Sequence, residues 1–518
     1  MKCWKLLTLW LCALSAGTNE ASVTEKERYS VLMVSMPYAG HLLPMTALGE
    51  ELVRRGHNAT LCSTTMKGYE LPQVAAKKAG MTFLDAGRHY YYTIEELNEA
   101  NRAVEEQSVY EAIEEFITKT RYDSDQIESA LNNPILRSWD VMIVDGGLSA
   151  STACYNRRWA IPLISLWLTA SIAPSHLPQW PFPLILFPEY NDDLQFQDRL
   201  KITILKFILM AIVPPDVPIR GMNCSGSYEY AANAPGHHVP EILNSVVGHG
   251  FEFARPVSPL SSYVGPILTK QLDPLPGDLQ SWLESRSPNS VVYISMGTRV
   301  YISYEIAQAL IEGIMSTDFG VLWSLRESNQ DVLSHLEIDT SRVYVKKWMP
   351  QLSVLNHTAV GIAVLHGGAG GVQEALFSGV PAIVIPGFSF EQNAISYRIQ
   401  HFKLGVRLDR ESLTAEKVAN ALKVVNSNDC RQAVAKLQKM YSMAGGVDKA
   451  ANLVEFYTEY GYEHLVPAYA KYQWSWVQYY NVDVYALIFF TLLVCTYCLV
   501  RFCFCGFRFL CSRKAKTE

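Results

Sequence analysis

Short apolar runs alternate with helical patterns along most of the chain. The runs are three to five residues long and rich in valine and isoleucine, which is typical of strands buried on both faces of a parallel sheet. Those predicted to be strands cover residues 30–34, 59–62, 141–144, 291–294, 321–323, 343–345, 362–365 and 382–385. After the first run, a loop over 36–44 and a helix over 45–55, closed by Gly56, complete the first β–α step. This alternation predicts the α/β class.

The chain is expected to divide into two such α/β halves, because 518 residues are too many for one hydrophobic core. Five prolines fall within residues 254–278, a density that neither a helix nor a central strand tolerates. We therefore predict an N-terminal domain over 18–255, a linker over 256–278, a second domain over 279–450 and a helical segment over 451–482. A cleft between the two halves is the expected ligand site.

Both ends of the chain carry apolar segments of another kind. Residues 1–17 combine lysines, a short apolar stretch and small residues, which is the layout of a cleaved signal peptide. Residues 484–500 carry no charge, so we predict a transmembrane helix over 483–504, followed by a basic tail over 505–518. The positive-inside bias places this tail in the cytosol and residues 18–482 in a lumen. The expected topology is single-pass type I.

The end of the tail bears on localisation. Lys514 and Lys516 stand fifth and third from the last residue. This spacing resembles the dilysine retrieval signal of endoplasmic reticulum membrane proteins and predicts that location. Ordinary basicity after a membrane span is the alternative interpretation.

Composition and charge limit the function classes. With 44 Lys plus Arg against 50 Asp plus Glu, the net charge of −6 provides no basic footprint, so nucleic acid is not an expected partner. The four cysteines between the two apolar ends show no metal-ligand spacing, and no metal site is expected. These cysteines are Cys62, Cys154, Cys224 and Cys430. Glycosylation sequons stand at Asn58, Asn223 and Asn356.

Residues 348–392 are the most informative window. A predicted strand ends where a glycine-rich turn, H-G-G-A-G-G over 366–371, begins, and a helix is expected from near Val372. Backbone N–H groups at such a helix start favour an anion, and His366 can donate to a phosphate oxygen. Glu374, one turn into the helix, can accept from the hydroxyls of a ribose. The window therefore predicts a nucleotide site.

A second group of polar residues belongs to the N-terminal half. The sequence P-Y-A-G-H-L-L-P over 37–44 places His41 on a loop at the carboxyl end of the first strand. Imidazole is basic enough near neutrality to take a proton from an alcohol. Asp145 follows the strand 141–144 at the same sheet edge, where it can fix the tautomer of the ring. We predict that this pair is a general base and its partner; a loop histidine that only forms local hydrogen bonds is the alternative.

Together these motifs resemble the UDP-glycosyltransferase family, which includes the UDP-glucuronosyltransferases. The resemblance rests on the ordered set W…Q…HGG…E…P…EQ over 348–392 and on S-M-G-T over 295–298. It extends to F-E-F-A-R-P-V-S-P-L-S-S-Y-V-G over 251–265 and to P-Q-W-P-F-P over 178–183. The resemblance implies two Rossmann-like domains facing a cleft, the arrangement called GT-B, with a UDP-sugar as co-substrate and no cofactor. It also implies a signal peptide, an endoplasmic reticulum membrane anchor and a lumenal catalytic part.

The resemblance further implies a role for each matching residue. Trp348 would stack on uracil, and Gln351 would contact the base or the ribose. Glu374 would hold the ribose, and Glu391 with Gln392 would bind sugar hydroxyls. The diphosphate would be held by Ser295, Thr298, His366 and Gly368. The full set of expected donor-binding residues is Ser295, Gly297, Thr298, Trp348, Gln351, His366, Gly368, Gly370, Gly371, Glu374, Glu391 and Gln392. His41 and Asp145 match the catalytic pair.

The implied activity is inverting, metal-independent transfer of a hexose or glucuronic acid to a hydroxyl of a lipophilic small molecule. One departure is that Gly370 and Gly371 replace the usual Asn and Ser, which makes the turn closer to that of sterol and bacterial antibiotic glycosyltransferases. A non-catalytic nucleotide-sugar-binding protein, or a partner subunit of a transferase, is the alternative. A nicotinamide or flavin oxidoreductase is disfavoured because no G-x-G-x-x-G follows the first strand.

The sequence leaves the substrates open. The sugar can be glucuronate, glucose or galactose, and Arg255 does not decide between them, since a linker arginine more often pairs with a local acid. The acceptor pocket is expected to draw on residues 80–125 and 165–215. Within the second of these, the apolar stretch 202–213 is a core helix, an interfacial helix or part of that pocket. Homo- or hetero-oligomers are both compatible with the sequence.

Overall fold

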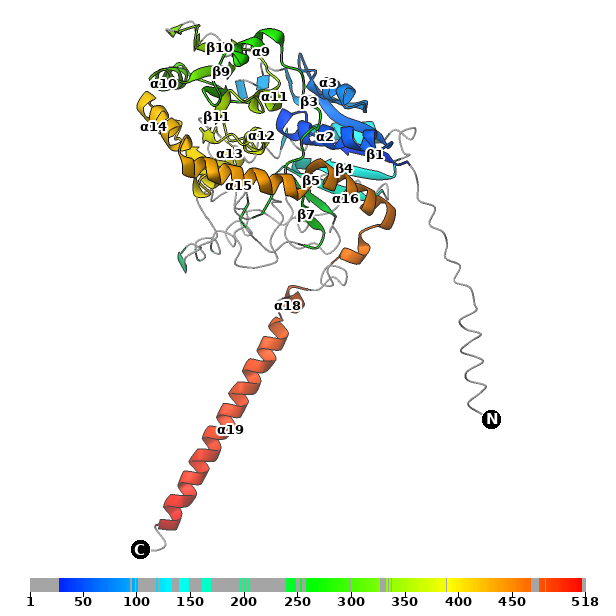
Figure 1. Ribbon diagram of the computed structural model, residues 1–518. Coiled ribbons are helices and arrows are strands. Elements are labelled where there is room, and N and C mark those ends of the chain that lie inside the picture. Colours follow the sequence, from blue (N-terminus) through cyan, green and yellow to red (C-terminus); the bar gives the residue numbers. More distant parts are fainter. Residues whose placement is uncertain are drawn as a thin grey trace, which may run out of the picture.

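The computed structural model contains two α/β halves that lie side by side and a long helix that leaves them (Figure 1). The structure describes residues 28–93, 139–148, 161–168, 239–247, 252–253, 258–297, 300–326, 332–333, 335–336, 338–387, 389–466, 475–479 and 481–514. It also describes 96–97, 99–100, 118–119, 122–123, 125–132, 196–197, 200 and 204. The predicted signal peptide, the apolar stretch 202–213 (apart from residue 204) and the motif 178–183 lie outside these residues.

The N-terminal half is built on a parallel sheet in the order β3-β2-β1-β4-β5-β6-β7. Its strands are β1 (Ser30–Val34), β2 (Asn58–Lys67), β3 (Thr82–Thr93), β4 (Val141–Asp145), β5 (Leu163–Trp167), β6 (Glu241–Leu243) and β7 (Ser261–Tyr263). The helices α2 (Ala39–Arg54) and α3 (Leu71–Lys78) and the 3-10 turn η3 (Gly146–Leu148) belong to this half. Because β1 pairs with both β2 and β4, the strand order reverses there, and a crevice at the carboxyl ends of β1 and β4 is the expected ligand position.

The C-terminal half repeats this plan with the strand order β10-β9-β8-β11-β12-β13, all parallel. Its strands are β8 (Val291–Ser295), β9 (Gly320–Ser324), β10 (Val343–Lys346), β11 (Val360–Leu365), β12 (Ala382–Val384) and β13 (Gly405–Arg407). Its helices are α9 (Gly277–Glu284), α10 (Tyr304–Met315), α11 (Gln351–Leu355), α12 (Ala369–Phe377), α13 (Phe390–His401), α14 (Ala415–Val425) and α15 (Asn428–Ala444). The order reverses between β8 and β11, which again marks the ligand edge. The predicted fold class is confirmed.

The last helix of the double-domain part returns to the first half. After α15 the chain turns at Gly445, whose φ of 100° suits glycine, and α16 (Gly446–Tyr460) follows. Val454 and Tyr457 of α16 are buried in one apolar cluster with Leu48 and Leu52 of α2. At the rim, Arg55 pairs with Glu455 at 2.8 Å. The chain therefore crosses between the halves twice, first between β7 and α9 and again between α15 and α16. After the second crossing, α16 packs against α2 of the N-terminal half.

The structure corrects several predicted boundaries. Helix α2 begins at Ala39 rather than Met45 and continues through the buried Pro44, so His41 lies in its first turn and not on a loop. Helix α12 begins at Ala369 rather than near Val372. Sequence reasoning places breaks at proline and glycine, but burial of one face against the sheet stabilises both helices through these residues.

The linker and the segment after the second domain also differ from expectation. Strand β7 lies inside the predicted linker 256–278, because residues between its prolines pair with β6 at the edge of the sheet. Helix α16 spans the predicted boundary at 450 and packs on the N-terminal half, where its apolar face is buried against α2. The division of the chain into separately folding domains stays a prediction.

At the C-terminal end, α18 (Trp476–Tyr479) precedes α19 (Val482–Lys514), which extends away from both halves (Figure 1). Residues 482–503 of α19 have a mean hydropathy of 2.1 and none of their apolar window is buried, and at 1.5 Å per residue they span about 33 Å, enough to cross a bilayer. Among the described residues this is the one helix of that length and composition. The helix continues to Lys514, into the predicted tail 505–518, and the last four residues lie outside the described part.

Candidate active site

His41 and Asp145 meet at the ligand edge of the N-terminal sheet. The ring Nδ1 lies 2.9 Å from Oδ2 and 3.1 Å from Oδ1 of the carboxylate. The side chain of Asp145 is 2% exposed, whereas that of His41 is 25% exposed. An ionised carboxylate only accepts, so Nδ1 donates to Asp145. The structure therefore brings together the two side chains that were predicted to pair.

The carboxylate of Asp145 is held from behind by backbone donors. The N–H of Gly147 donates to Oδ1 at 2.9 Å, and the N–H of Met36 points to Oδ2 at 3.4 Å. Asp145 ends β4, and Gly147 belongs to the η3 turn that follows. These contacts orient the carboxylate toward the ring.

In the C-terminal half, α12 follows β11, next to the point where the strand order reverses. The N-terminus of this helix consists of glycine and alanine. Gly368 is the N-cap, and the first bond within the helix runs from the N–H of Val372 to the carbonyl of Gly368 at 3.1 Å. By helix geometry the N–H groups of Ala369, Gly370 and Gly371 have no partner within the helix. Gly370 and Gly371 therefore contribute main-chain donors from the first helical turn, and the macrodipole adds a positive potential.

The imidazole of His366 is packed between two glycines. A Cβ atom on Gly297 would lie 2.5 Å from Cε1 of this ring, and one on Gly368 would lie 2.6 Å from Nε2. Gly297 also has a φ of 68°, which side chains rarely adopt. Burial lowers the pKa of His366 to about 4, so the ring is neutral at pH 7 and can donate one hydrogen bond. Ser295, at the end of β8, is partly buried next to this turn.

Gln351 and Glu374 form a pair behind the helix start. The Nε2 group of Gln351, the first residue of α11, donates to Oε2 of Glu374 at 2.6 Å. Tyr293 donates its hydroxyl to Oε1 of Gln351 at 3.1 Å. Burial raises the pKa of Glu374 from 4.5 to about 7 against this hydrogen bond. Trp348, in the loop before α11, is 68% exposed, which leaves its ring open to a stacking partner.

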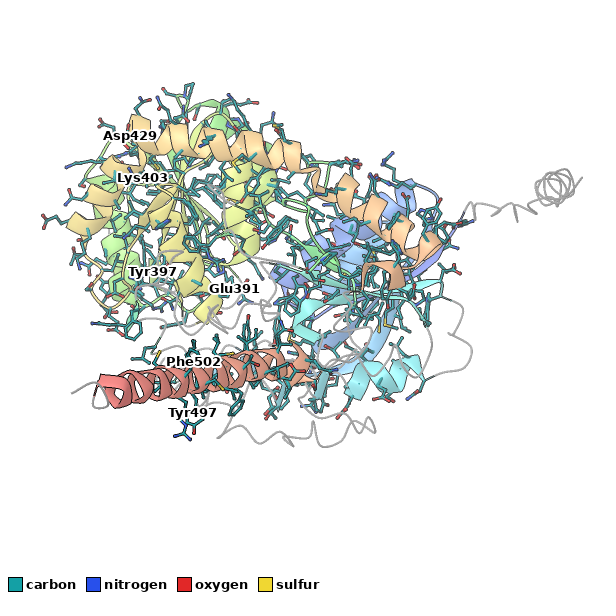
Figure 2. The ribbon with its side chains drawn as sticks, turned by 90° about the horizontal axis from the view of Figure 1, so that it is seen from below. Glu391, Tyr397, Lys403, Asp429, Tyr497 and Phe502 are labelled. Carbon is teal, nitrogen blue, oxygen red and sulfur yellow. The ribbon has the colours of Figure 1, made fainter. Side chains whose placement is uncertain are left out.

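Glu391 and Gln392 open α13 at the side of the C-terminal half that faces the other half, as Figure 2 shows for Glu391. Burial raises the pKa of Glu391, while His41 and Arg398 act in the opposite direction, and Glu252 and Asp145 add to the rise. The oxygen of the Gln392 amide accepts from the N–H of Gly387 at 2.9 Å. Glu391 therefore shares an electrostatic environment with the His41–Asp145 pair.

Two contacts between the halves were not predicted from the sequence. The amide of Gln373, which is 1% exposed, donates to the carbonyl of Asn244 at 2.8 Å. Arg398 of α13 pairs with Glu252 at 3.0 Å, and the carboxylate is 2% exposed. A glutamine next to Glu374 and an arginine inside a helix carry no sequence signal of such contacts, because their partners lie more than 100 residues away. They hold α12 and α13 against the N-terminal half.

The remaining predicted residues lie outside the described part of the chain or away from the two groups of polar residues above. Thr298 and Asn223 lie outside the described residues. Asn58 and Asn356 are exposed, the first opening β2 and the second ending α11, so both are accessible sequons whose use stays a prediction. Cys62 and Cys430 are buried free thiols. Within the described part of the chain, no three His, Cys, Asp or Glu side chains come together as a metal site.

Two Rossmann-like halves, with a His–Asp pair on one sheet edge and a glycine-rich helix start on the other, define a GT-B glycosyltransferase fold. Solved structures agree with this assignment. A glycosyltransferase of kitacinnamycin matches with a TM-score of 0.56 and 19% identity over 85% of this chain and 100% of its own. UGT89C1 of Arabidopsis thaliana, solved with quercetin, matches with a TM-score of 0.55 and 19% identity over 83% of this chain and 99% of its own.

The family follows from the sequence comparisons. The model described as UDP-glucoronosyl and UDP-glucosyl transferase matches residues 233–517, more than half of the chain, and the protein therefore belongs to this family. UDP-glucuronosyltransferase 2B33 of Macaca mulatta is 26% identical over 361 residues, which are 66% of this chain and 63% of that protein. The 2-hydroxyacylsphingosine 1-beta-galactosyltransferase of Rattus norvegicus is 27% identical over 375 residues, 70% of this chain and 66% of that protein. The match thus covers slightly less than two thirds of these relatives.

Proposed function

We propose that the protein transfers a hexose or glucuronic acid from a UDP-sugar to a hydroxyl group of a lipophilic small molecule, with inversion and without a metal ion. The observation that carries the proposal is the His41–Asp145 pair, which lies at the carboxyl-end edge of the N-terminal sheet and interacts electrostatically with Glu391 of the second half. Family membership and the helix start at Gly368 support a nucleotide sugar as the donor.

The reaction follows from the positions of these groups. Nε2 of His41 takes the proton of the acceptor hydroxyl while Asp145 stabilises the imidazolium that forms. The acceptor oxygen attacks the anomeric carbon on the face opposite the diphosphate, so the C–O bond to UDP breaks as the new bond forms. The N–H groups at the start of α12 and the neutral ring of His366 donate hydrogen bonds to the leaving UDP and so stabilise the negative charge that develops on it. No step requires a metal or an oxidant.

We assign the donor contacts residue by residue. The exposed ring of Trp348 stacks on uracil, and Gln351 contacts the base or the ribose. Glu374 accepts from the ribose hydroxyls, and Glu391 with Gln392 binds hydroxyls of the sugar close to His41. The diphosphate is assigned to Ser295, Gly297, Thr298, His366, Gly368, Gly370 and Gly371. Gly370 and Gly371 lack the side-chain donors of the usual Asn and Ser, but they retain their main-chain N–H donors. The replacement is therefore compatible with catalysis as well as with the non-catalytic alternative.

We also propose a single-pass type I topology in the endoplasmic reticulum membrane, with the two halves in the lumen. The apolar helix over 482–503 and the basic residues after it support this orientation. One relative is named as a 2-hydroxyacylsphingosine galactosyltransferase, and this name together with the membrane helix favours a lipophilic acceptor.

The experiment is a substitution of the general base. His41→Ala is expected to bind UDP with unchanged affinity and to lose transfer by about a hundredfold or more. UDP release is measured with the full chain in detergent, using UDP-glucuronate, UDP-glucose and UDP-galactose against a phenolic and a sterol acceptor. His464→Ala, which removes an exposed imidazole outside the cleft, is the matched control. Full activity of His41→Ala would show that His41 is not the general base. If the wild type binds UDP but releases none from any UDP-sugar, the non-catalytic alternative is favoured.

A further inference from the structure

A second His–Asp pair lies behind the first, deep inside the N-terminal half. His89 of β3 is fully buried, and its Nδ1 lies 2.7 Å from Oδ1 of Asp123, which is 3% exposed. The same carboxylate oxygen accepts from the backbone N–H of Tyr90 at 3.1 Å. The pair has no part in the chemistry proposed above.

The other nitrogen of this second imidazole is hydrogen-bonded to Tyr38, which stands three residues before His41. Nε2 of His89 lies 2.8 Å from the hydroxyl of Tyr38, whose side chain is 7% exposed. The Asp123 carboxylate accepts from Nδ1, and the hydroxyl of Tyr38 is hydrogen-bonded to Nε2. Thr64 lies at 3.4 Å from Nδ1 and adds a weaker contact. The three residues Asp123, His89 and Tyr38 form one buried hydrogen-bonded chain.

Tyr38 is also the N-cap of α2, the helix that carries His41. Its backbone carbonyl accepts from the N–H of His41 at 3.0 Å and from the N–H of Leu42 at 2.9 Å. Its side chain forms no capping bond to the helix, because the hydroxyl is directed at His89 instead. The side chain of Tyr38 is therefore fixed by the buried pair, and its main chain fixes the first turn of α2.

We propose that the chain Asp123–His89–Tyr38 is a positioning device for the general base: it holds the N-terminus of α2 so that the ring of His41 meets both Asp145 and the acceptor hydroxyl. Burying an imidazole and a carboxylate is costly compared with apolar residues of similar size, so stability alone does not account for them. Asp145 holds the ring of His41 through Nδ1, and the carbonyl of Tyr38 holds the backbone of the same residue. Displacement of a reacting group by about 1 Å can reduce the rate by on the order of a hundredfold.

The inference rests on the proposed transferase function, and its test separates the two. Tyr38→Phe removes one hydroxyl and keeps the ring. It is expected to lower kcat at least about tenfold while KM for the UDP-sugar stays within about twofold, because the donor site lies in the other half. Tyr29→Phe is the matched control: its hydroxyl donates to Glu459, also in the N-terminal half, but at the opposite edge of the sheet. It is expected to leave kcat unchanged.

A conservative pair of variants tests the rest of the chain. Asp123→Asn keeps an oxygen that accepts from His89, so kcat is expected to stay within about threefold of wild type. Asp123→Leu removes the acceptor and is expected to reproduce the loss of Tyr38→Phe. If Asp123→Asn and Asp123→Leu lose kcat equally, or if Tyr38→Phe behaves as Tyr29→Phe does, the positioning role is wrong.

A readout that needs no activity completes the test. Hydrogen exchange at the amides of His41 and Leu42 is expected to accelerate about tenfold in Tyr38→Phe, since the cap of α2 is loosened, and to stay unchanged in Tyr29→Phe. An unchanged rate in Tyr38→Phe overturns the inference even if the wild type proves to be inactive. Conversely, the wild type could transfer no sugar while amide exchange is faster in Tyr38→Phe. That result would refute the proposed function, but it would still show that Tyr38 holds the N-terminus of α2.

Discussion

The ionisation of Glu374 can be measured in the stability of the protein. Burial raises its pKa from the ordinary 4.5 to about 7. Between these two pH values the folded chain holds a proton that the unfolded chain has released, so the stability contributed by this group falls as the pH rises through that window and is constant above it. At 1.36 kcal/mol per pH unit, the fall amounts to about 3 kcal/mol.

Glu374→Gln removes the ionisable group and keeps the size of the side chain. Relative to wild type, the free energy of unfolding of the variant is expected to rise by about 2 to 3 kcal/mol between pH 5 and pH 8, because only the wild type buries a charge at the higher pH. The measurement is urea unfolding of the full chain in detergent, followed by tryptophan fluorescence. Glu411→Gln, at an exposed position, is the control. A difference between variant and wild type that is equal at both pH values would refute the reasoning.

The same group should make donor binding depend on pH. If the ionised carboxylate accepts the ribose hydroxyls, the affinity for uridine is expected to fall about tenfold from pH 8 to pH 6, as the carboxylate takes up a proton. Uridine is used because it lacks the phosphates of UDP, which titrate in the same range. Calorimetry on Glu374→Gln is expected to show weak, pH-independent binding. Equal uridine affinity of the wild type at both pH values would show that Glu374 is not the ribose acceptor.

Three further substitutions test the site and the frame around it. Asp145→Asn is expected to lower kcat by about a hundredfold or more with UDP affinity unchanged, since the amide no longer stabilises the imidazolium of His41; calorimetry and UDP-release assays together check this. Gly297→Ala is expected to cost about 1 to 3 kcal/mol in urea unfolding and to weaken UDP binding, because the new methyl group meets the ring of His366; wild-type values for both would contradict the packing. Glu51 is 3% exposed and accepts from Arg54, Arg55 and Lys270, which hold its pKa well below the usual range. Glu51→Gln is therefore expected to lose about 3 kcal/mol at pH 7, a difference that closes only in strong acid as the wild-type carboxylate is protonated.

Several parts of the fold follow from local pattern. The runs at 291–294 and 362–365 predict β8 and β11 almost to the residue, because a strand buried on both faces has no polar positions. Strands β6 (E-I-L), β7 (S-S-Y) and β13 (G-V-R) were not predicted, because polar residues or glycine interrupt the apolar run that marked the equally short β12 (A-I-V). The longer strands β3 and β5 were not predicted either. Their pairing depends on a neighbouring strand that is already in place.

The site divides in the same way. The order of motifs identifies His366, Glu374 and Gln392 and the family to which they belong, and a histidine after the first strand points to His41. The contacts of these residues are tertiary: no local signal places Gln373 against Asn244, or Arg398 against Glu252. Likewise, His89 and Asp123 are 34 residues apart, and only the fold of β3 against the following helical segment brings them within hydrogen-bonding distance.

The sequence by itself determined which chemical groups are present and in what order, because residue type and short-range periodicity are properties of the chain. It predicted two α/β halves, a glycine-rich helix start and a membrane-spanning helix. Only the tertiary structure decided that α2 runs through Pro44 and carries His41 in its first turn. It also decided that the ring meets Asp145, 104 residues away, and that a buried pair stands behind it. These contacts depend on strand order and on packing across two sheets, because both bring residues that are remote in sequence next to each other.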